Sequence, residues 1–328
     1  MSIKTISVLF LTLTSSLLAS DIVEPTAKKE AVPSLTHVWL SGDLLCLQAK
    51  ENRLDYANNA QGITPSANYT TSSVVQPHFA WNCGVKIDAG FQPEDWFFFA
   101  NWTHIVNTAK GVSSTNGSEG FFPLWSLGSG ITDTGYVTSA HFDWSLDTQI
   151  VDVGSIISWG FGKRFILKAH GAIRTAFLDQ RFNIQYGGGF FSEGTDTVTM
   201  KNNFFGVGPA IGLSPNIMLG RGFNILGDIA GSALLGSFFL KQKEKYLRET
   251  LFYETNTMTR VRYSLDAKAA INWQTEFLYK SLVFSIQTGW EWHKYYDQNQ
   301  LQQNSFDFFN DKRSLILRGG FISLTLGF

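Results

Sequence analysis

The most constraining feature of the chain is a long run in which apolar and polar or small side chains alternate without a break. Between positions 79 and 92 every second residue is apolar, from Phe79 to Phe91, and the residues between them are small or polar. Side chains along a strand point alternately to the two faces of a sheet, so this run predicts a strand with one apolar face. This run is longer than the strands of soluble proteins, which average about 5–6 residues. Residues 165–177, 259–274 and 282–293 repeat the pattern.

Composition favours lipid as the solvent of that apolar face. Charged residues make up 16% of the chain, against about 25% in soluble domains. Phenylalanine occurs 28 times, tryptophan 10 times and glycine 30 times. Alternation of apolar with polar or small residues is typical of barrel strands, whose side chains face lipid and lumen in turn. The sequence therefore predicts an all-β fold, a transmembrane antiparallel up-and-down β-barrel.

The spacing of these runs predicts ten strands joined by alternating short periplasmic turns and long outer loops. We expect them at residues 37–50, 79–92, 96–107, 139–159, 165–180, 201–214, 222–240, 259–274, 281–294 and 314–328. The long loops would span 51–78, 108–138, 181–200, 241–258 and 295–312. An even number places both ends of the barrel on the periplasmic side. Alternation slips between Thr148 and Val151, which indicates a bulge or a hidden hairpin, so twelve strands is the alternative.

Two further segments leave alternatives open. Pro209 lies inside a strand pattern and removes one ladder hydrogen bond, which favours a bulge or a turn there. Residues 223–240 are apolar enough to compete as a transmembrane helix. That helix would place Asp228 in the bilayer at a cost of about 2.5–3.5 kcal/mol, so we expect a strand with Asp228 facing the lumen.

The first residues have the pattern of a secretory signal peptide. Lys4 precedes an apolar stretch at 6–18 that is too short to span a bilayer, and Ala19 and Ser20 are small residues at a plausible cleavage site. We expect a cleaved signal peptide at 1–20, export to the outer membrane, a flexible periplasmic spacer at 21–36 and the barrel at 37–328.

The last strand predicts how the barrel closes. Ile322, Leu324, Leu326 and Phe328 share one face, and a free apolar edge would invite aggregation. We expect this strand to pair with residues 39–47. It resembles the closing strand of bacterial outer-membrane barrels, which implies recognition by the barrel-assembly machinery.

The polar faces of the predicted strands supply candidate lumen residues. A charged lining could select solutes, or compensating ion pairs could fill a narrow barrel, since ten strands lie nearer the filled limit of eight than the open limit of 16–18. Two cysteines on the first two strands, Cys46 and Cys83, could form a disulfide, link two chains or stay inert. The candidate lumen residues are Lys86, Asp88, Lys168, His170, Arg174, Asp228, Arg260, Arg262, Asp266, Lys268, Glu291 and His293.

Several short motifs, taken in order, resemble the Legionella-type, major-outer-membrane-protein-like pore-forming family, distantly related to chlamydial porins. The chain departs from that pattern at Cys46 and at Ala210. The resemblance implies an outer-membrane location and a pore, and it supplies no catalytic residues. The motifs are residues 43–49 with 54–57, 102–104, 171–174 with 179–180, 203–209 and 289–291.

We therefore predict a porin-like passive pore for small hydrophilic solutes, with a non-conducting structural or adhesive surface protein as the alternative. Its partners would be outer-membrane lipid and the assembly machinery, and a homo-oligomer is left open. Basic and acidic residues number 26 and 27, so nothing favours nucleic-acid binding. Neither cofactor nor enzymatic activity is expected. His104, His141 and His293 lie near predicted outer strand ends, and His141 and Asp143, two residues apart on one face, could touch as a catalytic pair.

Overall fold

The computed structural model describes residues 38–61, 72–93, 97–115, 119–126, 136–277, 282–301 and 314–328. The predicted signal peptide and spacer lie outside these residues. Every regular element of the described chain is a strand. Among these residues there is no helix long and apolar enough to cross a membrane.

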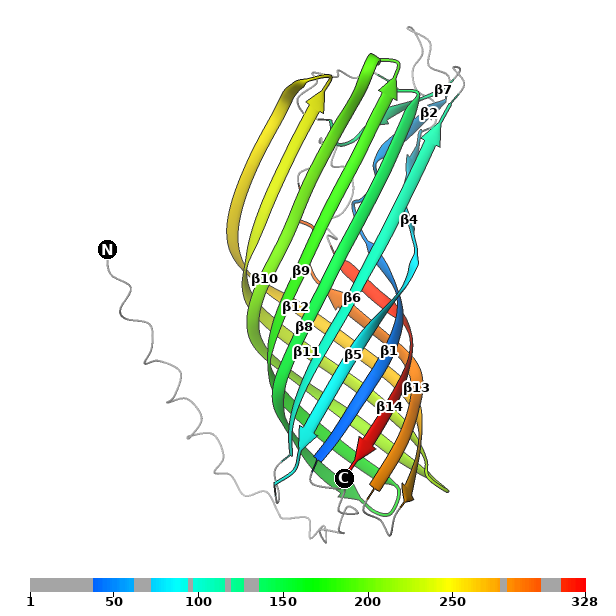
Figure 1. Ribbon diagram of the computed structural model, residues 1–328, viewed down its shortest axis with the longest axis vertical. Coiled ribbons are helices and arrows are strands. Elements are labelled where there is room, and N and C mark those ends of the chain that lie inside the picture. The colour runs from blue at the N-terminus through cyan, green and yellow to red at the C-terminus, as the bar shows by residue number, and fades with distance from the viewer. Residues whose placement is uncertain are drawn as a thin grey trace, which may run out of the picture. The chain divides into compact units, whose positions relative to one another are not determined.

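Ten described strands form one closed antiparallel ring, as the sequence predicts (Figure 1). A short strand, β4 (His78–Phe79), pairs with β6, and a second sheet joins β3 (Ser72–Val75), β2 (Ala57–Gln61) and β7 (Glu119–Pro123). In ring order the ten strands are β1 (Val38–Glu51), β5 (Trp81–Phe91), β6 (Phe97–Ser114), β8 (Ser139–Phe161), β9 (Phe165–Gly188), β10 (Phe191–Gly220), β11 (Phe223–Tyr246), β12 (Glu249–Phe277), β13 (Leu282–Tyr295) and β14 (Leu315–Gly327).

The first and last strands close the ring. β1 and β14 pair as predicted, and their register places Leu40 opposite Leu326 and Leu45 opposite Phe321. At the end of the ladder, Val38 and Phe328 exchange two backbone hydrogen bonds of 3.1 and 2.9 Å. We call this the terminal end of the barrel, and the opposite end the loop end. Short turns at the terminal end and long connections at the loop end follow the pattern of outer-membrane barrels, in which the short turns are periplasmic.

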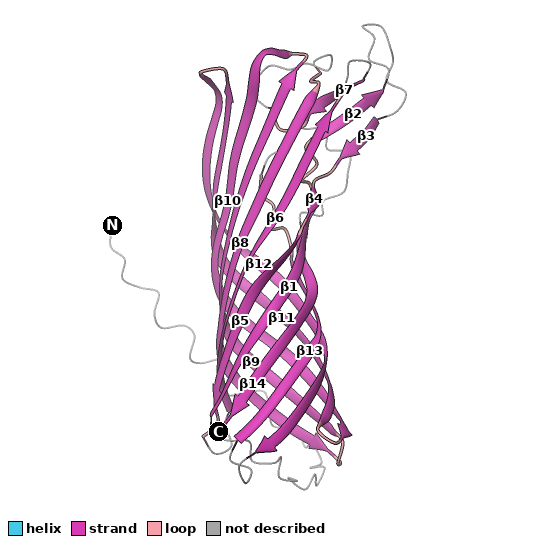
Figure 2. Ribbon diagram, turned by 45° about the vertical axis from the view of Figure 1, so that its right-hand side comes forward, coloured by secondary structure: helices cyan, strands magenta, loops and turns pink. Residues whose placement is uncertain are grey.

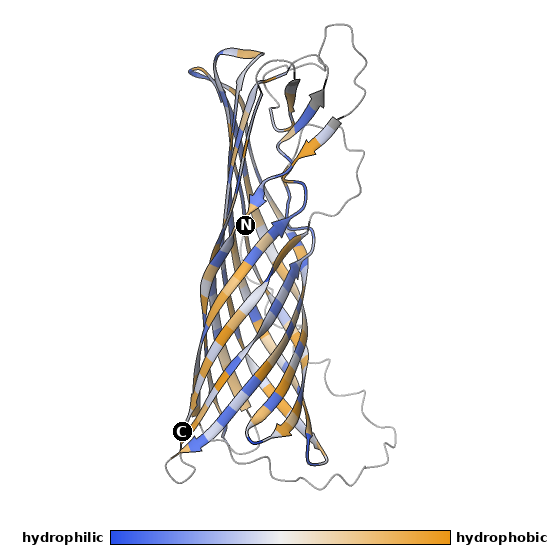
Figure 3. Cartoon of the chain, turned by 90° about the vertical axis from the view of Figure 1, so that its right-hand side faces the viewer, coloured by the Kyte–Doolittle hydropathy of each residue, from blue (hydrophilic) through white to orange (hydrophobic). Residues whose placement is uncertain are grey.

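An apolar band surrounds the terminal half of the barrel. On β14, Ile322, Leu324, Leu326 and Phe328 point outward and are 43–54% exposed. On β1 the outward residues are apolar or small from Val38 to Cys46, after which Gln48 and Lys50 follow. Such a stretch matches the 9–11 residues of a tilted transmembrane strand. Figure 3 shows apolar and polar residues alternating along these strands.

β8 explains the slip in alternation that the sequence shows near Thr148. The strand pairs with both β6 and β9 without any register shift, so the predicted bulge or hairpin is wrong, and so is a twelve-stranded barrel. What changes along β8 is the environment of its outward and inward faces. Toward the terminal end Val151 and Val153 point outward and Asp152 points inward, whereas toward the loop end the outward residues are polar and the inward ones apolar.

Three other expectations need correction or are resolved by the strand pairing. The loops predicted at 181–200 and 241–258 are strand extensions, since β9 and β10 continue to a turn at 189–190 and β11 and β12 continue to a turn at 247–248. Pro209 interrupts the β10–β11 ladder but shifts no register there, so the predicted bulge is wrong. Residues 223–240 form part of β11, as expected for a strand.

The long strands β8–β12 rise beyond the rest of the barrel as a curved sheet (Figure 2). The small sheet β2–β3–β7 covers part of the inner face of this extension. Tyr186 donates its hydroxyl to the backbone oxygen of Tyr56 at 2.6 Å, and the Trp125 indole donates to the backbone oxygen of Asp55 at 2.8 Å. The first bond joins an outer connection to β9, and the second joins two outer connections to each other.

The apolar band can be tested by placing a charged side chain on its outward face at two different depths. Leu324→Arg places a cation on the outward face opposite Gly42, near the middle of the band. We expect it to lower the free energy of unfolding by about 2–4 kcal/mol, and Val38→Arg, at the terminal edge, by about 0–1 kcal/mol. Denaturant titration of the barrel in lipid vesicles measures both. Equal losses at the two positions would contradict a lipid-facing band.

Candidate functional site

A cluster of charged side chains spans the lumen from β8 to β12. The Arg174 guanidinium on β9 makes a bidentate pair with Asp152 on β8, at 2.8 and 2.9 Å. Its third nitrogen, Nη1, donates to Asp266 at 2.5 Å and to the Ser264 hydroxyl at 3.2 Å, both on β12. Arg174 is only 8% exposed. A planar guanidinium suits this geometry because its donors match two carboxylates at once.

The cluster continues onto β13 and returns to β5. His293 is hydrogen-bonded to Asp266 at 3.0 Å and to Glu291 at 3.2 Å. Glu291 in turn lies 3.5 Å from the Lys268 amine and 3.9 Å from the Lys86 amine. We call the connected set the charged belt; its members are Asp152, Arg174, Asp266, His293, Glu291, Lys86 and Lys268.

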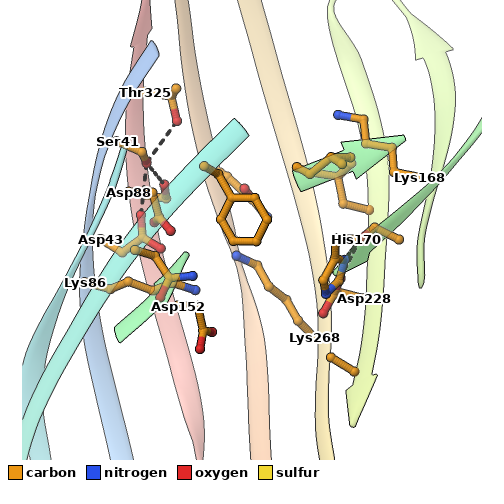
Figure 4. Close-up of a pocket in the computed structure, with 18 of the residues that line it drawn as sticks. Ser41, Asp43, Lys86, Asp88, Asp152, Lys168, His170, Asp228, Lys268 and Thr325 are labelled. Carbon is orange, nitrogen blue, oxygen red and sulfur yellow. Dashed lines mark hydrogen bonds and ion pairs between the residues drawn. The ribbon is translucent and has the colours of Figure 1, made fainter. Parts of the chain in front are cut away.

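A cavity of about 470 Å³ lies between the charged belt and the terminal end. Its lining reaches Trp39, Phe97 and Gly327, which are terminal-end residues of β1, β6 and β14, so the cavity extends to the periplasmic mouth. Figure 4 shows two groups on its walls. Ser41 is hydrogen-bonded to Asp43 and Thr325 on one side. His170 lies 3.6 Å from Asp228 on the other.

Ten of the twelve residues predicted for the lumen line this cavity. The other two lie nearer the loop end: Arg260 donates to Gln300 at 3.2 Å, and Arg262 pairs with Asp297 at 3.7 Å. The ten are Lys86, Asp88, Lys168, His170, Arg174, Asp228, Asp266, Lys268, Glu291 and His293. Their proximity follows from alternation alone, because a closed barrel sends one face of every strand to the same lumen.

Sequence reasoning missed two acids that matter for this geometry. Asp152, the bidentate partner of Arg174, sits just past the apparent slip in alternation of β8, so its face could not be assigned. Asp43 was noticed only within a family-like motif. Its position opposite Lys86 on β5 depends on strand register, which a single sequence does not give.

Beyond the charged belt, the described lumen is packed with apolar side chains. Leu45, Leu47, Leu146, Leu178 and Phe238 are each at most 1% exposed. We call this packing, with the other buried apolar inward residues of β1, β8, β9, β10 and β11 on the loop-end side of the charged belt, the apolar plug. A space of about 50 Å³ is found between it and the belt. This space has about a tenth of the volume of the cavity on the terminal side of the belt.

A polar chain runs through the apolar plug. Gln180 donates to both carboxylate oxygens of Glu51, at 3.0 and 2.9 Å, and accepts from Asn202 at 2.7 Å. Asn202 also donates to the backbone oxygen of Gln298. These bonds tie β1, β9 and β10 to the connection after β13. These hydrogen bonds favour one packing arrangement, because breaking any of them would leave a buried polar atom unpaired at a cost of about 1–3 kcal/mol.

In the extension, burial and the nearby Glu244 carboxylate raise the pKa of Asp196 to about 7. Asp196 lies on the inward face of β10, well past the apolar band, and is fully buried. Glu244, on β11, accepts a hydrogen bond of 2.7 Å from Ser126. Two carboxyl groups thus share a buried region outside the membrane.

The cysteines and the candidate catalytic pair lie on the outer surface. Cys46 and Cys83 are register partners on β1 and β5, and both are free thiols. His141 and Asp143 do touch, at 2.6 Å, and Asp143 also lies 3.8 Å from Lys110. Within the described ranges, no group of three or more His, Cys, Asp or Glu side chains could hold a metal ion.

One family model decides the relationship. The model described as "Legionella pneumophila major outer membrane protein precursor" matches residues 31–328, nearly the whole chain. The chain belongs to this family. The resemblance seen in the sequence motifs is thereby confirmed, and the protein is an outer-membrane β-barrel. Among curated proteins, none matches the chain.

Three solved structures are distantly similar to this family member. The outer membrane protease OmpT from Escherichia coli is 11% identical, with 90% of this chain and 96% of that chain covered and a TM-score of 0.41. A Pseudomonas aeruginosa FadL homologue is 7% identical, with 90% of each chain covered and a TM-score of 0.25. The Pseudomonas putida toluene transporter TodX is 7% identical, covering 88% and 89%, with a TM-score of 0.21. Likenesses this distant carry no argument about activity.

The charged belt can be tested by removing its central cation. Arg174→Met leaves Asp152 and Asp266 buried without their shared partner, and we expect the free energy of unfolding to fall by about 3–5 kcal/mol. Lys168→Met is the matched control, on the same strand and in the same cavity, because no acid of the described chain pairs with Lys168. Tryptophan fluorescence in denaturant follows both variants. A loss as large for Lys168→Met would show that the belt has no special role.

Asp196 predicts a pH dependence in the extension. Folding raises the pKa of this carboxyl from 3.8 to about 7, so the folded state favours the protonated form. Its contribution to stability is therefore complete below about pH 3.8 and is lost as the pH rises through about 7. Asp196→Asn should remove this decline. The difference between the wild-type and variant unfolding free energies, measured from pH 4 to pH 8, isolates the effect; parallel curves would contradict it.

Proposed function

We propose that the protein is a non-conducting structural barrel of the outer membrane. The observation that carries the proposal is the apolar plug beyond the charged belt, where inward side chains are almost fully buried. Solute passage would need these side chains to leave their packing. Each large buried apolar side chain is stabilised by about 1.5–3 kcal/mol relative to exposure, so an aqueous path through several layers would cost far more than thermal energy supplies.

The extension supports a structural or adhesive surface role for the same proposal. Its long hairpins and the small sheet β2–β3–β7 present a folded surface on the outer side of the membrane, with its own buried core. The proposal assigns no catalytic step. We still expect the barrel-assembly machinery to recognise β14, the strand that closes the ring by pairing with β1.

A porin-like passive pore for small hydrophilic solutes is the second candidate. The observation that favours it is the periplasmic cavity of about 470 Å³, which is lined by charged and polar side chains. A pore of this kind would require a path past the charged belt. The cavity has the chemistry of a solute vestibule, whereas the plug has that of a protein core.

Planar-bilayer recording separates the two candidates. The full barrel, refolded in detergent and checked by different gel migration of boiled and unboiled samples, should give no ion current, while a general porin reconstituted in parallel conducts. Liposome swelling with small sugars should likewise match protein-free vesicles. Reproducible unitary currents across several preparations would overturn the structural proposal and favour the pore.

A further inference from the structure

Five cations gather on the outward face of the barrel just beyond the apolar band. They are Arg181 on β9, Lys201 on β10, and Lys241, Lys243 and Lys245 on β11. We call them the basic patch. All five have the parity of outward residues on their strands, and four of them are classed as exposed. They are five of the 26 basic residues of a chain that also has 27 acidic residues.

Strand register places these cations side by side. Arg181 lies directly opposite Lys201, and Lys201 directly opposite Lys241. Like charges directly opposite one another on neighbouring strands are destabilising. The lysines of β11 add to the repulsion, because Lys245 and Lys241 lower the pKa of Lys243. An arrangement that concentrates repulsion in this way is well suited to hold an anion.

The protein supplies little of the missing negative charge. Across the described residues, no acid forms an ion pair with any of the five, and Asp179, two residues before Arg181 on the same face, does not reach it. The surface of β6 and β8 differs, since Lys110 there pairs with Asp143 at 3.8 Å. The Lys241 amine lies 5.5 Å from the centre of the Tyr253 ring, a contact that leaves its charge uncompensated.

The position of the basic patch identifies the anion's source. One or two outward positions toward the terminal end lie Phe177, Phe205 and Phe239, which are 43%, 43% and 53% exposed. The rings of Phe177 and Phe205 pack at 4.9 Å. These side chains end the apolar band on β9–β11, so the cations lie at the depth of lipid head groups. A free anion would have no reason to select this boundary.

We propose that the basic patch binds the phosphate groups of an anionic outer-leaflet lipid, whose acyl chains pack on the aromatic edge of the apolar band. Cations next to a membrane surface attract anionic head groups, and lysine and arginine bind phosphate by charge-assisted hydrogen bonds. Phosphate oxygens would bridge Arg181, Lys201 and Lys241 and relieve their mutual repulsion. The inference does not depend on whether the lumen conducts.

Lipid titration of the refolded full-length barrel in dodecyl maltoside tests the proposal, with bisphosphorylated lipid A as the probe and bound lipid counted by native mass spectrometry. The variant Lys201→Gln, Lys241→Gln, Lys243→Gln should bind about a hundredfold more weakly. The matched control Lys50→Gln, Lys110→Gln, Arg318→Gln removes three exposed cations elsewhere and should bind like the wild type. Gel migration before and after boiling confirms that each variant folds.

Two further arms keep the test decisive. Replacing the same three patch lysines by arginine should preserve binding, and dephosphorylated lipid A should bind weakly to the wild type. Equal affinity of the wild type and the glutamine variant would overturn the proposal. So would equal binding of the dephosphorylated lipid, or full competition by inorganic phosphate at concentrations comparable to the lipid, which would indicate a free-phosphate site instead.

Discussion

Closure of the strand ring is the constraint on which the rest of the structure depends. In hydrocarbon every backbone N–H and C=O group must find a hydrogen-bond partner within the protein. The two edge strands of an open sheet would each leave a row of these groups unpaired. The β1–β14 ladder removes these edges, from Trp39 opposite Gly327 to Glu51 opposite Leu315. Once the ring is closed, alternation fixes which side chains meet lipid and which fill the lumen.

The outward faces of the same strands meet lipid in the terminal half of the barrel and water beyond it. On β9 the outward residues are Ile173, Thr175 and Phe177 within the apolar band, followed by Asp179 and Arg181 beyond the band. The inward residues change in the opposite sense, from charged to apolar. No register shift accompanies the change, since one continuous ladder joins β9 and β10 from residue 165 to 187. One continuous strand thus contributes outward side chains to the lipid-facing surface near its terminal end and inward side chains to a buried apolar core near its loop end.

This double role explains how far the sequence could predict the structure. Strand number, closure and lumen-facing residues follow from a period of two, which holds on both sides of the boundary. Strand length does not, because the outward side chains of residues 181–200 and 241–258 are mostly polar, a pattern read as loop when only lipid-facing alternation is sought. Asp152 was lost at the same boundary, where apolar residues change faces. Contacts across the lumen, such as Arg174 with Asp266, depend on closure geometry that one sequence does not contain.

The charged belt and the apolar plug fill the described lumen by different interactions, and each stabilises the other. Arg174 holds acids from β8 and β12, so separating those strands would leave buried charges unpaired. The plug next to the belt excludes water, which strengthens the belt's ion pairs because low polarity weakens charge screening. The belt in turn fixes the strands against which Leu45 and Leu178 pack. Water entry at either layer would therefore weaken the other, so opening should be cooperative rather than gradual. A barrel built this way is expected to be either closed or broadly rearranged, and a narrow leak would be its least stable state.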